Sequence, residues 1–340
     1  MRARTVLREP RKGCAALLFQ SDLRGGRGLK AYATADTANV SAKPGLAARL
    51  KKEWRKNAFV YVVLVPVLLH FLVFQAFPLG FSFVLSFMDW PIIGKAEFAG
   101  FKNWETFLHD RLAWKSIGNT LLFSLYYILP TMGIGLLLAL LVSVRSKLAG
   151  FFKSVYFVPV VTSFVVISGI WAWIFKGNDT GIFNYVLSWF GIGPQLFFSD
   201  SKQAMIVLAS LSVFKVCGST MVYYYAGLKS IPAHLYEAAK IDGASGWTMF
   251  WRITFVLLLP IHFYVAIFTT IGSFQIFDSA FLLTSGGPNY ATTTIVYYLY
   301  QEGFVGLRMG YASVLAYVLF FIVLILSLVQ RKFLGKEVHY

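Results

Sequence analysis

The sequence is poor in charged residues, cysteine and histidine. Only 14% of its 340 residues are charged, compared with about 25% in an ordinary soluble domain. Its two cysteines, Cys14 and Cys217, lie far apart, and neither has another thiol or an imidazole at metal-ligand spacing. These absences exclude a disulfide framework, a cysteine-based metal site and an ordinary soluble domain.

Groups that could carry out catalysis are also scarce. No two of the five histidines are three or four residues apart, as a metal site on a helix would require. His70 and His262 fall in apolar stretches, where packing or hydrogen bonding is expected of them. No glycine-rich loop ends in Lys-Ser or Lys-Thr, so no phosphate cradle is predicted. The chain is therefore expected to be no enzyme and to hold no cofactor or metal.

Long apolar stretches are what the sequence has instead, since 57% of it is hydrophobic. A membrane-crossing helix needs about 20 mostly apolar residues. Five stretches contain no charged residue, and a sixth is interrupted only by Lys215; together they are 57–88, 116–144, 154–175, 203–228, 253–277 and 309–330. The predicted fold class is all-α, a polytopic membrane protein with six transmembrane helices.

The distribution of Lys and Arg predicts the orientation. They are concentrated before the first stretch and after the second, fourth and sixth, and they are sparser in the alternate loops. Because cytoplasmic flanks carry the excess of positive charge, both termini are expected in the cytoplasm. The net charge of +16 is then an orientation signal, and no nucleic-acid partner is expected, since that would need a basic face with stacking aromatics.

The first 50 residues differ from the remainder, because they are rich in Arg, Gly and Ala and contain no long apolar core. They predict a basic, disordered cytoplasmic tail ahead of a transmembrane domain at 51–340. A folded segment that binds a partner is the alternative.

The loop after the fourth stretch, at about 229–252, has the pattern of a short helix. Pro232 suits a first helical turn, where its missing N–H costs nothing, and Gly243 suits the position just past a helix end. Ser245 is placed to cap a second helix. Such a helix either inserts into a groove of a partner protein or lies on the membrane surface.

Glu237-Ala238-Ala239, followed by Gly243, resembles the EAA loop of ABC importer permeases. Further segments resemble the carbohydrate-uptake branch of that family, the maltose-type first permease in particular; they are Leu228–Pro232, Tyr236–Ala239, Ile241–Ser245, Gly100–Trp104, Asn119–Leu121, Val158–Ser163, Leu283–Pro288 and Gly310–Ser313. The resemblance runs from about residue 55 to 333. The family usually continues Ile-x-Leu-Pro after the loop, whereas here Ile253 is followed by Thr-Phe-Val and a proline comes only at Pro260.

The resemblance implies the type I fold of ABC importer permeases, in the plasma (inner) membrane of a bacterial-type cell. It implies that Glu237, Ala238, Ala239 and Gly243 couple the chain to an ATPase. Implied partners are a second homologous permease subunit, two copies of a cytoplasmic ATPase that bind ATP and Mg²⁺, and an extracytoplasmic sugar-binding protein. A sugar or oligosaccharide would pass by alternating access. The alternatives are a permease for glycerol phosphate or another small polar solute, and an ion-coupled secondary transporter, which has no use for an EAA loop.

Polar residues inside apolar spans mark substrate pathways by default. Two such faces recur at helical spacing, and the residues on them are Ser212, Lys215, Ser219 and Tyr223 in the fourth stretch and Thr269, Gly272, Ser273 and Ile276 in the fifth. Hydroxyls and an aromatic ring suit a sugar; alternatively, each Ser or Thr bonds to its own helix or a neighbouring one. By helical angle, Gln275 and Asp278 are expected to point elsewhere, toward a partner subunit or the membrane edge.

Lys215 needs a partner, because a lysine in mid-span costs about 2.5–3.5 kcal/mol on insertion scales. Three partners are compatible with the sequence. Asp278 of the same chain could pair with it, a water-filled cavity could let it donate to a neutral sugar, or it could bind an acidic sugar such as an oligouronate.

Overall fold

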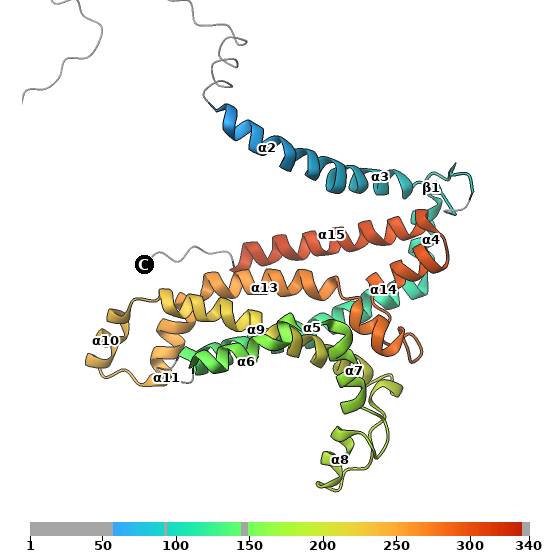
Figure 1. Cartoon of the computed structure of the whole chain (residues 1–340). Coiled ribbons are helices and arrows are strands. Elements are labelled where there is room, and N and C mark those ends of the chain that lie inside the picture. The colour runs from blue at the N-terminus through green and yellow to red at the C-terminus, as the bar shows by residue number, and fades with distance from the viewer. Residues whose placement is uncertain (1–56, 92–93, 144–148, 335–340) are drawn as a thin grey trace, which may run out of the picture. The chain divides into compact units, whose positions relative to one another are not determined.

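The computed structural model describes residues 57–91, 94–143 and 149–334. The predicted tail at 1–50 lies outside these described residues. The chain is divided into two compact units, Met1–Pro66 and Val67–Tyr340. In the described residues the structure is mainly helical (Figure 1), with one small antiparallel hairpin in which β1 (Met88–Asp89) pairs with β2 (Glu97–Phe98).

Four helical stretches are long and apolar enough to cross a membrane: Ala58–Leu85, Arg111–Ser143, Ala204–Ser230 and Met309–Phe333. Two bent pairs pass the same test together. Gly150–Val161 and Phe164–Ile174 meet at 97°, and Gly246–Leu257 and Leu259–Phe274 meet at 63°. Counting each bent pair as one span gives the six predicted spans, but the third and fifth are broken helices rather than straight ones.

Each break has a local cause in the backbone. Ser163 is extended (φ −56°, ψ 137°) and ends the helical run that precedes it. Leu258 lies at the edge of the helical region (φ −83°, ψ 0°), and Pro260 stands in the first turn of the helix that follows, where a proline is tolerated. Pro260, which comes later than the proline of the family pattern, thus lies at the bend within the fifth span.

The helices comprise these spans, or parts of them, together with shorter helices in the loops. Their bounds are α2 (Ala58–Phe71), α3 (Phe77–Leu85), α4 (Lys102–His109), α5 (Arg111–Ser143), α6 (Ala149–Val161), α7 (Phe164–Ile174), α8 (Ile182–Ser188), α9 (Ala204–Ser230), α10 (Ala233–Ile241), α11 (Gly246–Met249), α12 (Phe255–Leu257), α13 (Leu259–Phe274), α14 (Ile295–Tyr300) and α15 (Met309–Leu334). π-Helical turns cover Leu72–Ala76, Phe250–Thr254, Ala280–Thr284 and Gln301–Val305, and a 3₁₀ turn covers Phe197–Ser199.

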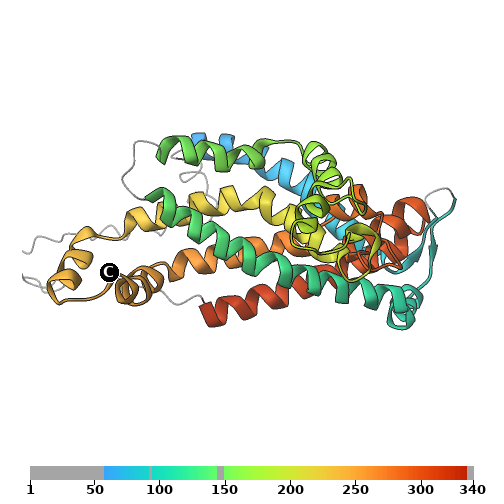
Figure 2. The same ribbon diagram turned by 90° about the horizontal axis from the view of Figure 1, so that it is seen from below.

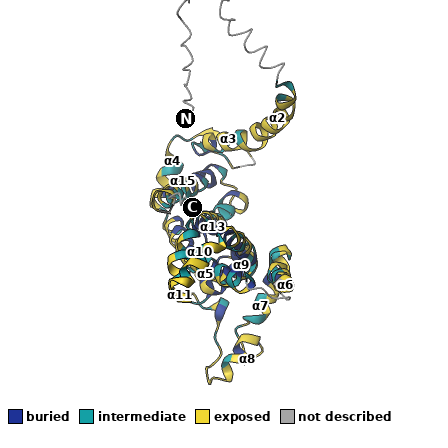
Figure 3. Cartoon of the chain, turned by 90° about the vertical axis from the view of Figure 1, so that its left-hand side faces the viewer, coloured by how far each residue is buried: buried dark blue, intermediate teal, exposed yellow. Residues whose placement is uncertain are grey.

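Helices α5, α9, α13 and α15 pack side by side as the bundle of the second unit (Figures 1 and 2). Three hydrophobic clusters follow one another along α5. The first is built around Ile117 with α14 and α15, the second around Phe123 with α9, and the third around Val142 with α9 and α13. In Figure 3 the buried residues gather where α5, α9 and α13 meet.

A carboxylate fixes the start of α5 to the C-terminal part of the bundle. Asp110 accepts the Leu112 and Ala113 N–H groups at 2.8 and 3.2 Å, which caps α5. It also accepts the hydroxyls of Tyr298 at 2.6 Å and Tyr311 at 2.5 Å. Burial alone would raise the pKa of Asp110, but these hydrogen bonds together hold it below its usual value. The side chain is therefore a charged clamp between α5, α14 and α15.

Candidate functional site

The helix predicted in the loop after the fourth span is present as α10, and its ends are defined by the backbone. Gly243 adopts φ +77° just past the helix. The Gly243 N–H donates to Lys240 O at 3.1 Å, and the Ala244 N–H donates to Ala239 O at 2.9 Å. This pair of bonds is the Schellman motif, which favours glycine because a left-handed residue has no Cβ penalty there. The predicted position of Gly243 is confirmed.

The start of α10 differs by one residue from the prediction, and the start of the next helix agrees with it. Pro232 stands at the N-cap of α10, one residue earlier than the first-turn position predicted. Ser245 caps α11 as expected, because its hydroxyl accepts the Thr248 N–H at 3.2 Å.

Helix α10 has one inner and one outer face. Leu235 and Tyr236 pack against the cluster around Val142, and the Tyr236 hydroxyl is hydrogen-bonded to Thr254 Oγ1 at 2.9 Å. Exposed residues recur at helical spacing on the other side at His234, Glu237, Ala238 and Ile241, and Ala233 and Lys240 are exposed as well. The Ile241 side chain is 87% exposed and that of Trp247 is 71% exposed. An apolar tip beside a small residue and a carboxylate is a surface suited to a protein partner.

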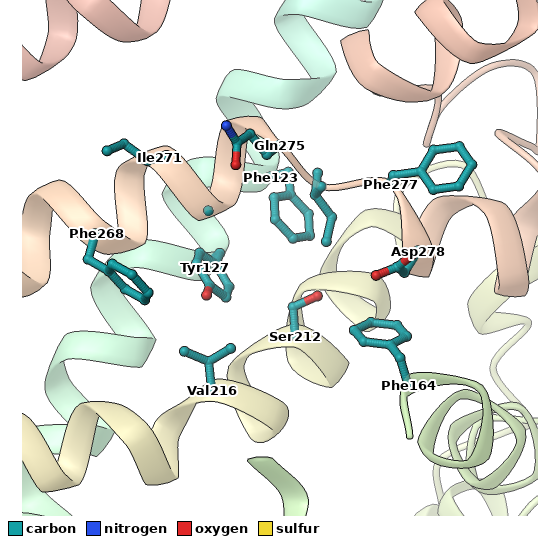
Figure 4. Close-up of a pocket in the computed structure, with 12 residues that line it drawn as sticks. Phe123, Tyr127, Phe164, Ser212, Val216, Phe268, Ile271, Gln275, Phe277 and Asp278 are labelled. Carbon is teal, nitrogen blue, oxygen red and sulfur yellow. The ribbon is translucent and has the colours of Figure 1, made fainter. Parts of the chain in front are cut away.

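A cavity of about 370 Å³ lies between α5, α7, α9 and the end of α13 (Figure 4). Five aromatic residues form a large part of its wall: Phe123, Tyr127, Phe164, Phe268 and Phe277. A few polar groups converge on it, from Tyr127, Ser212, Gln275 and Asp278. The remaining lining residues are Val216, Ile271, Gly272 and Ile276. An apolar cavity with a few polar groups has the character of a small-molecule site.

The structure brings only part of the predicted pathway to this cavity. Ser212, Gly272 and Ile276 line it, whereas Lys215, Ser219, Tyr223, Thr269 and Ser273 do not. The predicted hydroxyls bond within their own helices, Ser219 to Val216 O and Thr269 to Val265 O, for example. The Tyr223 ring contacts the edge of the Tyr264 ring instead. Whether any of these residues touches substrate stays a prediction.

The expectation for Gln275 and Asp278 was wrong. Both line the cavity, and Figure 4 places the Asp278 carboxyl group near Ser212 and Phe164. The reason is that α13 ends at Phe274, and Gln275 has left the helical conformation (φ −93°, ψ 10°). The prediction assumed that the helix continues past residue 274, and it therefore assigned these side chains the wrong direction.

Sequence reasoning also missed the aromatic wall. The Phe123 and Tyr127 rings stack at 5.6 Å between centroids, four residues apart on α5. The four-residue spacing of these two aromatic residues could have predicted a shared helical face, but the sequence prediction of the pathway considered mainly polar residues. Gly272 lies opposite the Tyr127 hydroxyl, because a Cβ built on Gly272 would stand 3.9 Å from it.

Lys215 has partners that none of the three sequence hypotheses named. Its ammonium donates to three main-chain carbonyls, those of Pro159 at 3.0 Å, Val160 at 2.9 Å and Thr162 at 2.7 Å. Asp278 is near enough to interact with it electrostatically. However, in the described part of the chain no acidic group lies within 4.0 Å of the ammonium.

His262, a titratable group within the fifth span, has a hydrogen-bond partner on the fourth. His262 lies in α13 and is hydrogen-bonded through Nδ1 to the Tyr224 hydroxyl at 2.9 Å. Over the residues that the structure describes, no three His, Cys, Asp or Glu side chains are close enough to share a metal ion.

Residues 131–331 match the family described as binding-protein-dependent transport system inner membrane component. The chain belongs to this family. It is an ABC transporter permease of the inner membrane, a transport component rather than an enzyme, and this agrees with the resemblance of the Glu237–Gly243 segment. The permease subunits of this family carry no cofactor themselves.

Two relatives illustrate the range of the family. The chain is 33% identical over 302 residues to the arabinooligosaccharides transport system permease protein AraP of Bacillus subtilis, covering 86% of this chain and 95% of that protein. It is 33% identical over 286 residues to the sn-glycerol-3-phosphate transport system permease protein UgpA of Agrobacterium fabrum, covering 82% and 96%.

Solved permeases have the same fold. A chain of a bacterial ABC transporter involved in the import of the acidic polysaccharide alginate is 26% identical, with a TM-score of 0.70 over 84% of this chain and 99% of that one. A second alginate transporter chain, in complex with alginate pentasaccharide-bound periplasmic protein, is 25% identical, with a TM-score of 0.72 over 84% and 96%. The type I importer permease fold is confirmed.

Proposed function

We propose that this permease carries an oligosaccharide across the membrane. The observation that carries the proposal is the cavity beside α13, where aromatic rings surround a few polar groups. Rings pack on the apolar faces of sugars, and hydroxyl, amide and carboxylate groups exchange hydrogen bonds with sugar hydroxyls. Its volume of about 370 Å³ falls in the range of about 300–1,000 Å³ that small-molecule sites occupy. The sugar cargo in the names of AraP and of the alginate importers supports the same class.

The charge of the cavity favours a neutral sugar. Its lining includes the Asp278 carboxylate and no Lys, Arg or His. A carboxylate attracts sugar hydroxyls through charge-assisted hydrogen bonds and repels anions. The Lys215 ammonium, which an acidic sugar could otherwise use, already donates to three carbonyls. An acidic oligosaccharide, the cargo of the alginate importers, is therefore a comparison substrate for the test.

Glycerol phosphate is the second candidate cargo, favoured by the 33% identity to UgpA. The carboxylate in the cavity wall argues against it, because a phosphate needs cationic or N–H donors.

The proposed assembly pairs this chain with a second permease, two cytoplasmic ATPases that bind ATP and Mg²⁺, and an extracytoplasmic sugar-binding protein. The outer face of α10, with Glu237, Ala238 and the Gly243 turn behind them, would insert into the ATPase, and Ala239 would support it from the inner side. Closure of the ATPases would then move α10, and the cavity would change from being open to one side of the membrane to being open to the other.

The proposed topology places both termini and α10 in the cytoplasm. Single cysteines at Asn178 and Asn289, both exposed, are expected to react with a membrane-impermeant maleimide in intact cells, because they lie in outer loops. A cysteine at Ser245, also exposed, should react only after permeabilisation. All three variants are made in a background with Cys14 and Cys217 replaced by alanine. Reaction of Ser245→Cys in intact cells contradicts the orientation.

Asp278→Asn should impair uptake of a neutral oligosaccharide. The change keeps the shape of the side chain but replaces a charged acceptor by a neutral one, and a hydrogen bond to a charged group contributes about 1.5–3 kcal/mol. We expect the uptake rate at low substrate concentration to fall roughly tenfold or more, measured with labelled arabino- or gluco-oligosaccharides in cells that express the whole transporter.

Asp179→Asn is the matched control, because Asp179 is exposed in a loop away from the cavity. Wild-type uptake of glycerol 3-phosphate without uptake of any oligosaccharide would establish the second candidate instead. An Asp278→Asn variant that matches wild type on neutral cargo would show that this carboxylate does not contact the sugar.

A further inference from the structure

The third span is interrupted in a way that leaves backbone carbonyls without helical partners. Helix α6 ends at Val161, Ser163 is extended, and α7 starts at Phe164 after a bend of 97°. In an unbroken helix the carbonyls of Pro159 and Val160 would accept the N–H groups four residues further on. Those N–H groups lie beyond the break. In a lipid environment each unsatisfied carbonyl costs several kcal/mol.

Lys215 supplies the missing donors from the neighbouring span. An ammonium group has three N–H donors, and the three from Lys215 are directed at the carbonyls of Pro159, Val160 and Thr162, at 3.0, 2.9 and 2.7 Å. The C-terminal end of a helix carries partial negative charge, so a cation is favoured there. The lysine and the broken helix thus satisfy one another's polar groups.

The packing of α6 on α9 is shaped for this contact. Gly218 lies three residues from Lys215, on the same face of α9. A Cβ on Gly218 would collide with the carbonyl oxygen of Tyr156. The absence of a side chain lets the backbone of α6 approach α9 closely, within reach of the ammonium.

We propose that Lys215 is a positioning residue: it caps α6, holds the third span bent, and thereby keeps Phe164 in the wall of the substrate cavity. Phe164 is the first residue of α7 and lines the cavity next to Ser212 and Asp278 (Figure 4). This role differs from direct contact with an acidic sugar, because no donor is left for the cargo. The expected effect of Lys215 on sugar transport rests on the proposed function, whereas its expected effect on the bend of the third span does not.

The test compares Lys215→Met, which keeps the length of the side chain and removes its donors, with Lys215→Arg, which retains charge and donors. Spin labels at Val155 and Trp173, both exposed, report the distance across the bend in the full chain in nanodiscs, with both native cysteines replaced. A straight helix would place these positions about 27 Å apart, and the bend makes the distance shorter. We expect Lys215→Met to lengthen and broaden this distance and Lys215→Arg to restore it.

Uptake by the whole transporter provides the second measurement. In Lys215→Met the KM for a neutral oligosaccharide should rise about tenfold or more, an acidic oligosaccharide should be affected no more than the neutral one, and Lys215→Arg should recover most of the activity. If Lys215→Met fails to reach the membrane, recovery by Lys215→Arg still supports the proposal, and failure of both variants overturns it.

Three further results overturn the proposal: an unchanged distance in Lys215→Met, loss of the bend in both variants, or selective loss of acidic cargo. The spin-label distance is measured without substrate, so it does not depend on the proposed cargo. If the proposed cargo is wrong, the wild-type transporter will not take up oligosaccharides, but the bend will still depend on Lys215.

Discussion

Replacing Gly243 with valine should reduce uptake at least about tenfold while the protein still reaches the membrane. The residue adopts φ +77°, and a left-handed backbone costs an ordinary residue about 1–2 kcal/mol, more for a β-branched one. No atom lies within 4 Å of a Cβ at this position, so the change introduces strain without a clash. The strain opposes the turn that ends α10, and with it the docking geometry of Glu237 and Ala238.

Two variants make this measurement specific. Gly246→Val, three residues on, also has nothing within 4 Å of its Cβ and does not have a positive φ; it should transport nearly as wild type. Gly243→Asn should retain most activity, because asparagine tolerates the left-handed conformation. Membrane level and copurification with the ATPase are measured alongside uptake. Equal activity of Gly243→Val and Gly246→Val would show that the turn does not contribute to coupling.

Gly218→Val should destabilise the protein and abolish transport. Its Cβ would collide with the Tyr156 carbonyl and lie 3.0 Å from the side chain of Val160, so α6 must move away from α9. Overpacking of this kind costs about 1–3 kcal/mol, which in a chain of this length corresponds to a fall of roughly 1–4 °C in apparent melting temperature. The same movement would pull the α6 carbonyls away from Lys215.

Gly169→Val is the control for the second variant, since Gly169 is an exposed helical glycine on α7 with nothing within 4 Å of its Cβ. It carries the same change in helix propensity without the clash. Thermal unfolding in detergent, followed by size-exclusion chromatography, should separate the two variants. If they unfold at the same temperature, the α6–α9 contact is looser than the structure indicates.

The sequence identified the features that depend on local composition. The stretches without charged residues predicted the membrane spans, because a charged side chain is costly anywhere in the lipid. Gly243 predicted the end of α10 and Ser245 the start of α11, because capping depends on residues within one helical turn. These predictions needed no knowledge of how the helices pack.

Features that depend on packing were not predictable in the same way. The third span breaks at Thr162–Ser163, where no proline stands, and its apolar window reads as an unbroken span. Asp278 was assigned to the wrong side because the end of α13 could not be placed. The hydrogen bonds from Tyr298 and Tyr311 to Asp110 join residues 188 and 201 positions apart, a separation at which helical periodicity carries no information.

The contact between Lys215 and α6 also bears on how the chain enters the membrane. Its acceptors, the carbonyls of Pro159, Val160 and Thr162, belong to a span that the ribosome completes before α9 emerges. The charge in α9 therefore meets acceptor carbonyls that have already been synthesised. A fourth span presented alone to the insertion machinery would carry an uncompensated ammonium. The hydropathy of that segment by itself thus underestimates how readily it inserts in its own chain.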